Sequence, residues 1–301
     1  MKLLVIGLDG AAPEILFGDD RLANFRRLMD LGCYGQLESA VDSNSLQAAA
    51  IWEHLARAGK RLLIIDLSPS YPPRAVNGSS IAEVGGAITR VMGDYLTDVA
   101  SVREDDRDGL MDQAYSTSRK QFDHVRRFLQ SEDWDYFQFV EIGLDHIQRG
   151  FWQYHDSRHA LFEPGNPYGN VVGDYYLYLD EQIGTILEAL TDETVVLVVS
   201  LRGWQGLDVE NDARGVEGVD RSDSGSFILA APHLPLHGEV HDAALSDIAP
   251  TLLDLGGYDI PASMQGRPLA SGLIHDLPGE TGLSREDEAI LRERLSGLGY
   301  I

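Results

Sequence analysis

The fold class is indicated by the stretch LLVIGLDG, which runs from Leu3 to Gly10. Its first six residues are apolar apart from one glycine, and the run ends at Asp9-Gly10, a dipeptide typical of turns. The run is too short for a helix and lacks the polar alternation of a half-buried strand. It therefore predicts a strand buried on both faces, as in a parallel sheet, with a carboxylate directly after it.

Comparable apolar runs alternate with helical patterns along the rest of the chain. Further buried strands are expected at 62–67, 136–142, 195–199 and 226–231. Helices are expected at 22–31, 46–58, 111–130, 171–190, 244–255 and 284–298. This alternation predicts an α/β fold in which helices cover both faces of a mostly parallel sheet, an α/β/α sandwich. Because no repeat or long linker interrupts the pattern, we expect one domain over 1–301.

The charge composition argues against two classes of binding partner. The 48 acidic and 24 basic residues give a formal net charge of −24, so nucleic acid and anionic membranes are expected to be repelled. Cys33 is the single cysteine, which excludes an internal disulfide and suits a reducing compartment. The sequence shows neither a secretory leader pattern nor an apolar run of membrane-spanning length. We expect a soluble protein in the cytoplasm.

Polar side chains follow the predicted strands at the points where these strands end. Asp9 and Asp145 each come soon after one, and Leu201-Arg202 follows the run at 195–199. Ligands of open parallel sheets bind at the carboxyl ends of the strands. A carboxylate there can hold a metal, bind a ligand or cap the next helix. Because buried carboxylates are costly unless paired or metal-bound, two of them predict a pocket.

Four segments carry a family resemblance: VIGLDGAAPEIL, NFRRLMDLGCYGQLES, WDYFQFVEIGLDHIQRGFWQYHD and SDIAPTLLDLGGYDIPASMQGRPL. In this order they resemble the type I phosphodiesterase/nucleotide pyrophosphatase branch of the alkaline phosphatase superfamily. The resemblance implies an alkaline-phosphatase-like sandwich, here with a reduced cap region. It also implies two divalent metal ions at the strand ends, with a Thr or Ser nucleophile between them.

The sequence departs from the family pattern at the first metal. The resemblance implies an Asp, a His four residues later and a distant second His as its ligands. Asp145, Arg149 and Arg221 stand at these places, although Asp220 or Asp223 is an alternative to Arg221 because the loop before it is shortened.

The second metal and the nucleophile depart from the pattern as well. Asp9 is kept, but Leu201-Arg202 replaces an Asp-His pair after the apolar strand. Ser43 and Ser45 are hydroxyls near the place of the nucleophile, but neither has the expected sequence context.

The arginines change what the pocket can bind. A guanidinium stays protonated and has no lone pair for a metal, so it repels a divalent ion as well as failing to bind it. We therefore expect no metal cofactor, with Asp9 and Asp145 as vestigial ligands. Arg149, Arg202 and Arg221 either pair with these aspartates and keep the cavity folded or clasp an anionic ligand.

The remaining candidates are histidines and tryptophans. His146 beside Asp145 is a possible general base, although a hydrogen-bonded structural role is the commoner reading. The other histidines have four-residue spacings that can bind metal on a helix, but we expect no ligation there: His155 and His159; His233, His237 and His241. Three tryptophans are expected in the core or the cavity wall: Trp52, Trp152 and Trp204.

Three functions remain open. The first is a degenerate superfamily member without two-metal phosphoester hydrolysis, a pseudoenzyme that binds an anionic small molecule or a protein partner, possible homo-oligomerisation included. The second is a metal-independent enzyme that acts on an anionic small molecule with Asp9, Asp145 or His146. The third is a residual phosphodiesterase or phosphatase with an atypical metal site. The fold alone would favour the third, but fold does not fix function.

Overall fold

The computed structural model describes most of the chain. The described residues are 1–38, 47–65, 88–91, 106–204, 221–222 and 224–269, except positions 132, 160, 192, 233 and 235. The helix predicted at 284–298 lies outside these residues, and so do five side chains named above: Ser43, Ser45, Asp220, Asp223 and His233.

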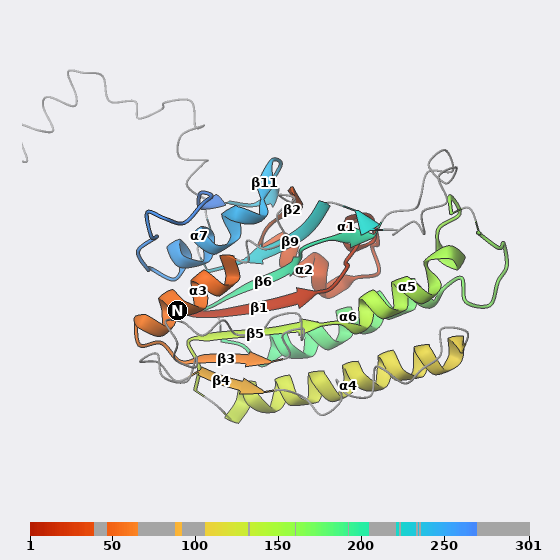
Figure 1. The fold of residues 1–301 in the computed structure, drawn as a ribbon, viewed down its shortest axis with the longest axis horizontal. Coiled ribbons are helices and arrows are strands. Elements are labelled where there is room, and N and C mark those ends of the chain that lie inside the picture. The colour runs from red at the N-terminus through yellow and green to blue at the C-terminus, as the bar shows by residue number, and fades with distance from the viewer. Residues whose placement is uncertain are drawn as a thin grey trace, which may run out of the picture.

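A mixed sheet of nine described strands forms the centre of the molecule (Figure 1). Its order is β10-β2-β9-β6-β1-β5-β3-β4, and β11 also pairs with β2. The central strand β1 is parallel to β5 and β6, whereas β9 is antiparallel to both of its neighbours. The strand bounds are β1 (Lys2–Leu8), β2 (Gly32–Glu38), β3 (Leu62–Ile65), β4 (Ile88–Val91), β5 (Tyr136–Glu141), β6 (Thr194–Ser200), β9 (Ser224–Ala230), β10 (Gly238–Glu239) and β11 (Ala243–Ala244).

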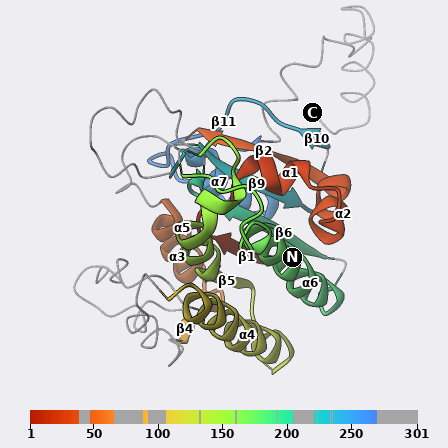
Figure 2. The same ribbon diagram turned by 90° about the vertical axis from the view of Figure 1, so that its right-hand side faces the viewer.

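Helices cover both faces of this sheet. One face packs against α2, α4, α5 and α6, and the other against α3 and α7, so three layers result (Figures 1 and 2). The helix bounds are α1 (Pro13–Gly18), α2 (Ala23–Leu31), α3 (Gln47–Arg57), α4 (Arg107–Ser131), α5 (Gly143–His155), α6 (Val171–Glu188) and α7 (Leu245–Leu255). The predicted α/β fold with a mostly parallel sheet is confirmed.

The two faces of β1 explain why its sequence is apolar throughout. Side chains alternate between the faces of a strand. Leu4 and Ile6 pack into the core beneath α4, α5 and α6, whereas Leu3 and Val5 pack into the core beneath α3 and α7. All four are at most 5% exposed. A polar residue at any of these positions would therefore enter a core, which is why the usual alternation is missing.

Two helices were not expected from the sequence, the six-residue α1 and the longer α5. The segment after β5 is the start of α5, so Asp145 lies in the first turn of a helix and not simply at a strand end. The prediction missed α5 because its buried face includes polar side chains, Asp145 and Gln148, among the apolar ones.

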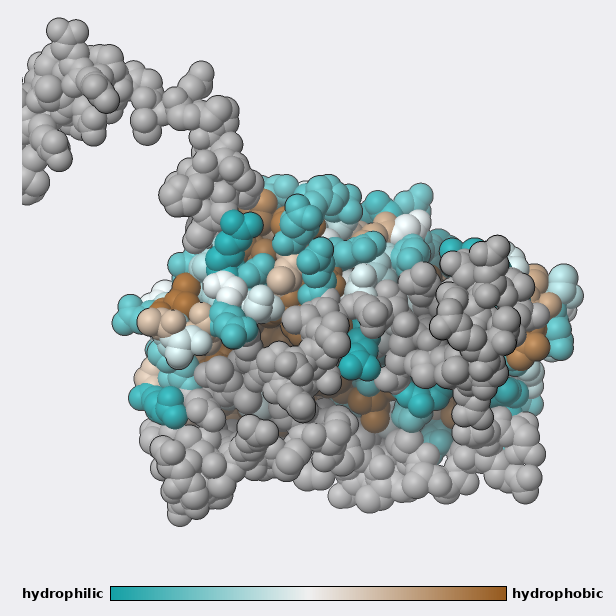
Figure 3. Space-filling model, turned by 45° about the horizontal axis from the view of Figure 1, so that its top comes forward, coloured by the Kyte–Doolittle hydropathy of each residue, from teal (hydrophilic) through white to brown (hydrophobic). Residues whose placement is uncertain are grey.

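On the face shown in Figure 3, hydrophilic residues cover much of the described surface, with smaller apolar areas between them. Among the described residues, the helices lack a stretch that is both long and apolar enough to cross a membrane.

Candidate functional site

The site lies where β1, β5 and β6 end, on the side of the molecule that Figure 2 turns toward the viewer. Asp9 follows β1 directly and its side chain is exposed. Its backbone N–H donates to the carbonyl of Glu141, the last residue of β5, at 3.0 Å. The parallel ladder between the two strands thus fixes the backbone at Asp9 while its carboxylate faces outward.

The turn after Asp9 is held by neutral hydrogen bonds. Gly10 has a left-handed φ of 81°, which suits glycine. The N–H of Ala11 donates to Ser200 Oγ at 3.0 Å, and Ser200 in turn donates to the carbonyl of Arg202 at 2.6 Å. Ser200 is buried at the end of β6, so it ties the β1 turn to the segment that follows β6.

A second pair of side chains joins the same turn to the helices. Gln148 of α5 donates from Nε2 to the Gly10 carbonyl at 2.7 Å. Tyr176 of α6 accepts from the N–H of Ala12 at 2.7 Å and donates to Gln148 Oε1 at 3.1 Å. Gln148 and Tyr176 are both fully buried. The backbone groups of the turn are therefore satisfied by protein atoms, which fixes its conformation.

Glu141 anchors the start of α5. Its carboxylate accepts from the N–H groups of Gly143 at 2.9 Å and Leu144 at 3.0 Å, and from the Tyr175 hydroxyl at 2.9 Å. The helix N-terminus leaves such N–H groups without helical partners. Burial raises the pKa of Glu141, against the N–H and O–H donors that favour its charged form.

Asp145 and Arg149 form an ion pair on the same face of α5. Arg149 Nη2 lies 2.8 Å from Asp145 Oδ2, and the side chains are 61% and 8% exposed, respectively. The four-residue spacing places them one above the other on the helix. Asp145 is thus a buried carboxylate with an arginine partner, at the place where the family resemblance implies a metal ligand.

The segment after β6 brings the other two arginines to the same end of the sheet. Arg202 is exposed, and in the part of the chain that the structure describes it makes no ion pair. Arg221 lies in β8 (Arg221–Ser222), which pairs with β7 (Gly203–Trp204) in a separate two-stranded sheet. The structure describes the backbone of Arg221 but not its side chain, so its proposed role stays a prediction.

Trp204 closes over the β1 turn. A Cβ built on Gly10 would lie 2.5 Å from Trp204 Nε1 and 3.0 Å from Gln148 Nε2. The Trp204 ring also lies 6.0 Å from the ring of Trp152 on α5, centroid to centroid. Both indoles are 4% exposed. They form a wall between the turn and α5, as expected for these two residues; Trp52 is buried in the opposite core.

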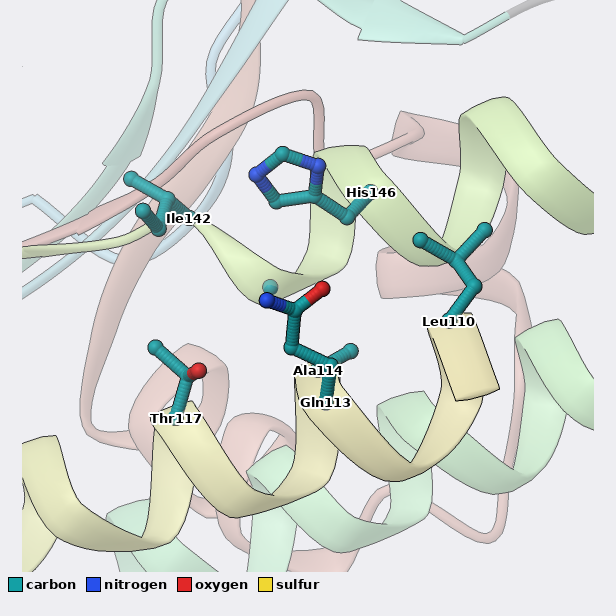
Figure 4. Close-up of a pocket in the computed structure, with 7 residues that line it drawn as sticks. Leu110, Gln113, Ala114, Thr117, Ile142 and His146 are labelled. Carbon is teal, nitrogen blue, oxygen red and sulfur yellow. The ribbon is translucent and has the colours of Figure 1, made fainter. Parts of the chain in front are cut away.

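His146 lines a small pocket between α4 and α5 (Figure 4). Its ring projects from α5 toward Gln113 and Ile142, while Leu110, Ala114 and Thr117 come from α4. The interior volume is about 10 Å³, which is roughly the space of one water molecule. Burial lowers the pKa of His146, and Arg149 lowers it further while Asp145 opposes the shift.

The donors that the structure describes at the strand ends do not by themselves make up a two-metal centre. Among the described residues, no three His, Cys, Asp or Glu side chains come close enough to share a metal ion. The four-residue His spacings do not place two imidazoles on one face of a helix, where they could bind a metal together. The helix α5 ends at His155, so His159 lies in the following loop. His237 and His241 lie on either side of the two-residue strand β10.

Several functional candidates were missed by the sequence reasoning. Glu141 ends a buried strand, as Leu8 does before Asp9, so the rule that singled out Asp9 could have found it. Ser200 ends another strand and could have been found in the same way. Gln148 and Tyr176 lie inside helices, and nothing in their local sequence distinguishes them from core or surface residues.

Comparisons with known proteins were made by sequence and by structure. No protein-family model and no curated protein matches the sequence. The solved structures that match include a proposed sulfatase of Bacteroides thetaiotaomicron, with a TM-score of 0.60 and 13% identity over 93% of this chain and 75% of that one.

Two further matches have other activities. A phosphonate monoester hydrolase of Agrobacterium radiobacter has a TM-score of 0.55 at 13% identity, over 93% of this chain and 78% of that one. The lipoteichoic acid synthase LtaP of Listeria monocytogenes has a TM-score of 0.53 at 14% identity, over 89% and 75%. The type I phosphodiesterase branch stays a prediction, and the comparisons show that this chain shares the alkaline-phosphatase-like fold of these sulfatases and hydrolases.

Proposed function

We propose that this chain is a non-hydrolytic protein with an alkaline-phosphatase-like fold, which uses the strand-end surface to bind an anionic small molecule. A protein partner at the same surface is the alternative within this proposal. The main support is the ion pair between Arg149 and Asp145 at 2.8 Å. It gives Asp145 a cationic partner of the protein's own, so the carboxylate does not need a metal for charge balance.

The exposed arginines supply the chemistry for an anionic ligand. Arg202 is exposed at the end of β6, and Arg149 is 61% exposed although one of its nitrogens binds Asp145. A guanidinium presents five N–H donors in a planar fork that suits phosphate, sulfate or carboxylate oxygens. Arg149 thus retains donors for a ligand while it holds Asp145.

Metal analysis and turnover test the loss of hydrolysis. Purified protein is dialysed against Zn²⁺, Mn²⁺ or Mg²⁺, its metal content is measured, and it is assayed with an activated phosphodiester and an activated sulfate ester. We expect less than stoichiometric metal and no turnover above buffer. Metal-dependent turnover that disappears in Asp9→Ala and Asp145→Ala, but persists in the surface variant Asp30→Ala, would contradict the proposal and favour the residual hydrolase.

Anion binding is tested separately by calorimetry with sulfate, phosphate and small carboxylates at fixed ionic strength. We expect binding of at least one of them, weakened about tenfold or more by Arg202→Gln and unchanged by Arg27→Gln, which alters an exposed arginine on α2. Equal affinities in the two variants would remove the assigned role of Arg202. A flat response of the wild type would favour the protein partner, which size-exclusion chromatography and cross-linking then examine.

One observation favours a metal-independent enzyme as second candidate. Burial lowers the pKa of His146, which favours the neutral imidazole, the form that can accept a proton. It lines the pocket between α4 and α5. In this case an anionic substrate would turn over without added metal and with EDTA present. His146→Gln would abolish that turnover while leaving substrate binding intact.

A further inference from the structure

The small pocket between α4 and α5 lies next to the Asp145–Arg149 pair along α5. His146 lines this pocket, and Arg149 follows three residues later, so the two side chains are neighbours on the helix surface. Helical side chains lean toward the N-terminus of their helix. Arg149 does so, since its Nη2 reaches back to Asp145 at 2.8 Å. Its guanidinium is therefore carried toward the turn of α5 that holds His146.

Two polar side chains of the pocket lack a hydrogen-bond partner among the described residues. They are Thr117, which is only 7% exposed, and His146. They lie on opposite sides of the pocket, Thr117 on α4 and His146 on α5 (Figure 4). A helical threonine can bond to a carbonyl one turn earlier, as Thr251 of α7 does with Asp247. Because buried polar groups are nearly always paired, the Thr117 hydroxyl points to a group that enters the pocket.

The size and walls of the pocket limit what that group can be. Leu110, Ala114 and Ile142 supply apolar surface, and the interior volume is about 10 Å³, which holds one group of the size of a water molecule. A threonine hydroxyl can both donate and accept a hydrogen bond, and an imidazole has at least one N–H donor. An alcohol hydroxyl can pair with both side chains, whereas a methyl group of similar size leaves both of them unpaired.

We infer that the ligand of the strand-end surface is a small hydroxylated oxyanion, such as a hydroxycarboxylate or a hydroxyalkyl phosphate. Its oxyanion binds the N–H donors that Arg149 retains, and its hydroxyl enters the pocket between Thr117 and His146. Helical residues three apart have Cβ atoms about 5–6 Å from each other, so a short molecule spans both positions. This inference deepens the proposed function and rests on it, because it requires that an anion binds at Arg149.

Calorimetry with matched pairs of anions tests the hydroxyl preference in the full-length protein. Hydroxyacetate is compared with propionate, and 2-hydroxyethyl phosphate with propyl phosphate, so that each pair exchanges a hydroxyl for a methyl group. We expect the hydroxylated member of at least one pair to bind about tenfold more tightly or better. Equal affinities within both pairs would overturn the inference and leave the proposed function standing. Absence of binding by all four anions would overturn the proposed function and the inference together.

The role of Thr117 is tested by removal of its hydroxyl alone. Thr117→Val is expected to abolish the hydroxyl preference while the affinity for the methyl members stays that of the wild type. Ser116→Ala removes an exposed hydroxyl from the adjacent position of α4 and should keep the preference. Because the Thr117 hydroxyl has no partner among the described residues, Thr117→Val should unfold at no lower temperature than the wild type. A full preference in Thr117→Val, or a lowered unfolding temperature, would overturn the assigned role.

Discussion

The ends of β1 and β5 lie side by side in one sheet, but the acidic side chains at the two ends differ in burial. At the end of β1, the Asp9 carboxylate is exposed and the turn behind it is fixed by neutral groups, among them Ser200 and Gln148. At the end of β5, Glu141 and Asp145 are buried, and each has its own donors.

This difference separates stability from recognition within a single surface. A buried carboxylate with protein donors contributes to the fold, and its loss leaves those donors unpaired. An exposed carboxylate contributes less to the fold and can be reached from solvent. We therefore expect mutations at the β5 end to change mainly stability, and mutations at the β1 end to change mainly binding.

The largest expected effect is at Glu141. Glu141→Ala leaves the N–H groups of Gly143 and Leu144 and the hydroxyl of Tyr175 without their acceptor. At about 1 kcal/mol or more for each group, urea unfolding should show a loss of about 3 kcal/mol or more. The exposed-site variant Glu193→Ala is the control and should change little. A loss below about 1 kcal/mol for Glu141→Ala would break the contrast between the two strand ends.

The next largest loss of stability is expected at Gly10, the position at the β1 end where a substitution should lower the free energy of unfolding. Gly10→Ala combines a left-handed φ of 81° with a contact of 2.5 Å to Trp204 Nε1. We expect a loss of about 2 kcal/mol or more. Gly18→Ala, at a site with open space around it, is the matched control. Part of the loss should be absent when Gly10→Ala is made in Trp204→Ala, and strict additivity would contradict the assigned contact.

The pH dependence of stability gives the third prediction. Burial raises the pKa of Glu141 in the folded state above its ordinary value of 4.5. Its favourable contribution is therefore full below the unfolded pKa and is lost as pH rises through the folded pKa. Relative to Glu141→Gln, the wild type should lose up to about 1.4 kcal/mol per pH unit as pH rises above 4.5. Parallel profiles of the two proteins, measured by urea unfolding, would show that Glu141 does not titrate in this way.

The two smallest expected effects are the coupling between Asp145 and Arg149 and, below it, the change in stability at Asp9. Arg149 is 61% exposed, so solvent screens the pair, and a double-mutant cycle of Asp145→Asn and Arg149→Gln should give about 0.5–1 kcal/mol. Asp9→Asn should change stability by less than about 0.5 kcal/mol. A larger stability effect at Asp9 than at the pair would reverse the comparison.

The strands β1, β3, β5, β6 and β9 were predictable because they are short apolar runs, whereas β2, β4, β10 and β11 were not expected from the sequence: β2 exposes Gln36 and Glu38, and β10 and β11 have two residues each. The expected strands at 136–142 and 195–199 match β5 and β6 within one residue at each end. The direction of β9 was not predictable, because the residues of a buried strand read alike in either orientation. The helix α5 was missed since its buried face includes polar side chains, Asp145 and Gln148, which bind site groups instead of apolar neighbours.

The site was predictable in its location but not in its connections. The strand-end rule placed Asp9 and Arg202 correctly on the carboxyl edge. The ion pair of Asp145 with Arg149 was one of two alternatives, which four-residue spacing on a helix allows but does not require. The bonds of Ser200 and Tyr176 to the β1 turn join residues more than 160 positions apart, and a single sequence carries no signal for such pairs.

The order of the strands has a consequence for synthesis of the protein. Among the described residues, β2 finds its strand partners only in β9, β10 and β11. A ribosome that adds roughly 5–20 residues per second completes β2 long before β9, so about ten seconds or more separate them. Throughout that time both edges of β2 offer unpaired backbone groups to other chains. Nascent chains that stall before β9 should therefore be the form of this protein most in need of a chaperone.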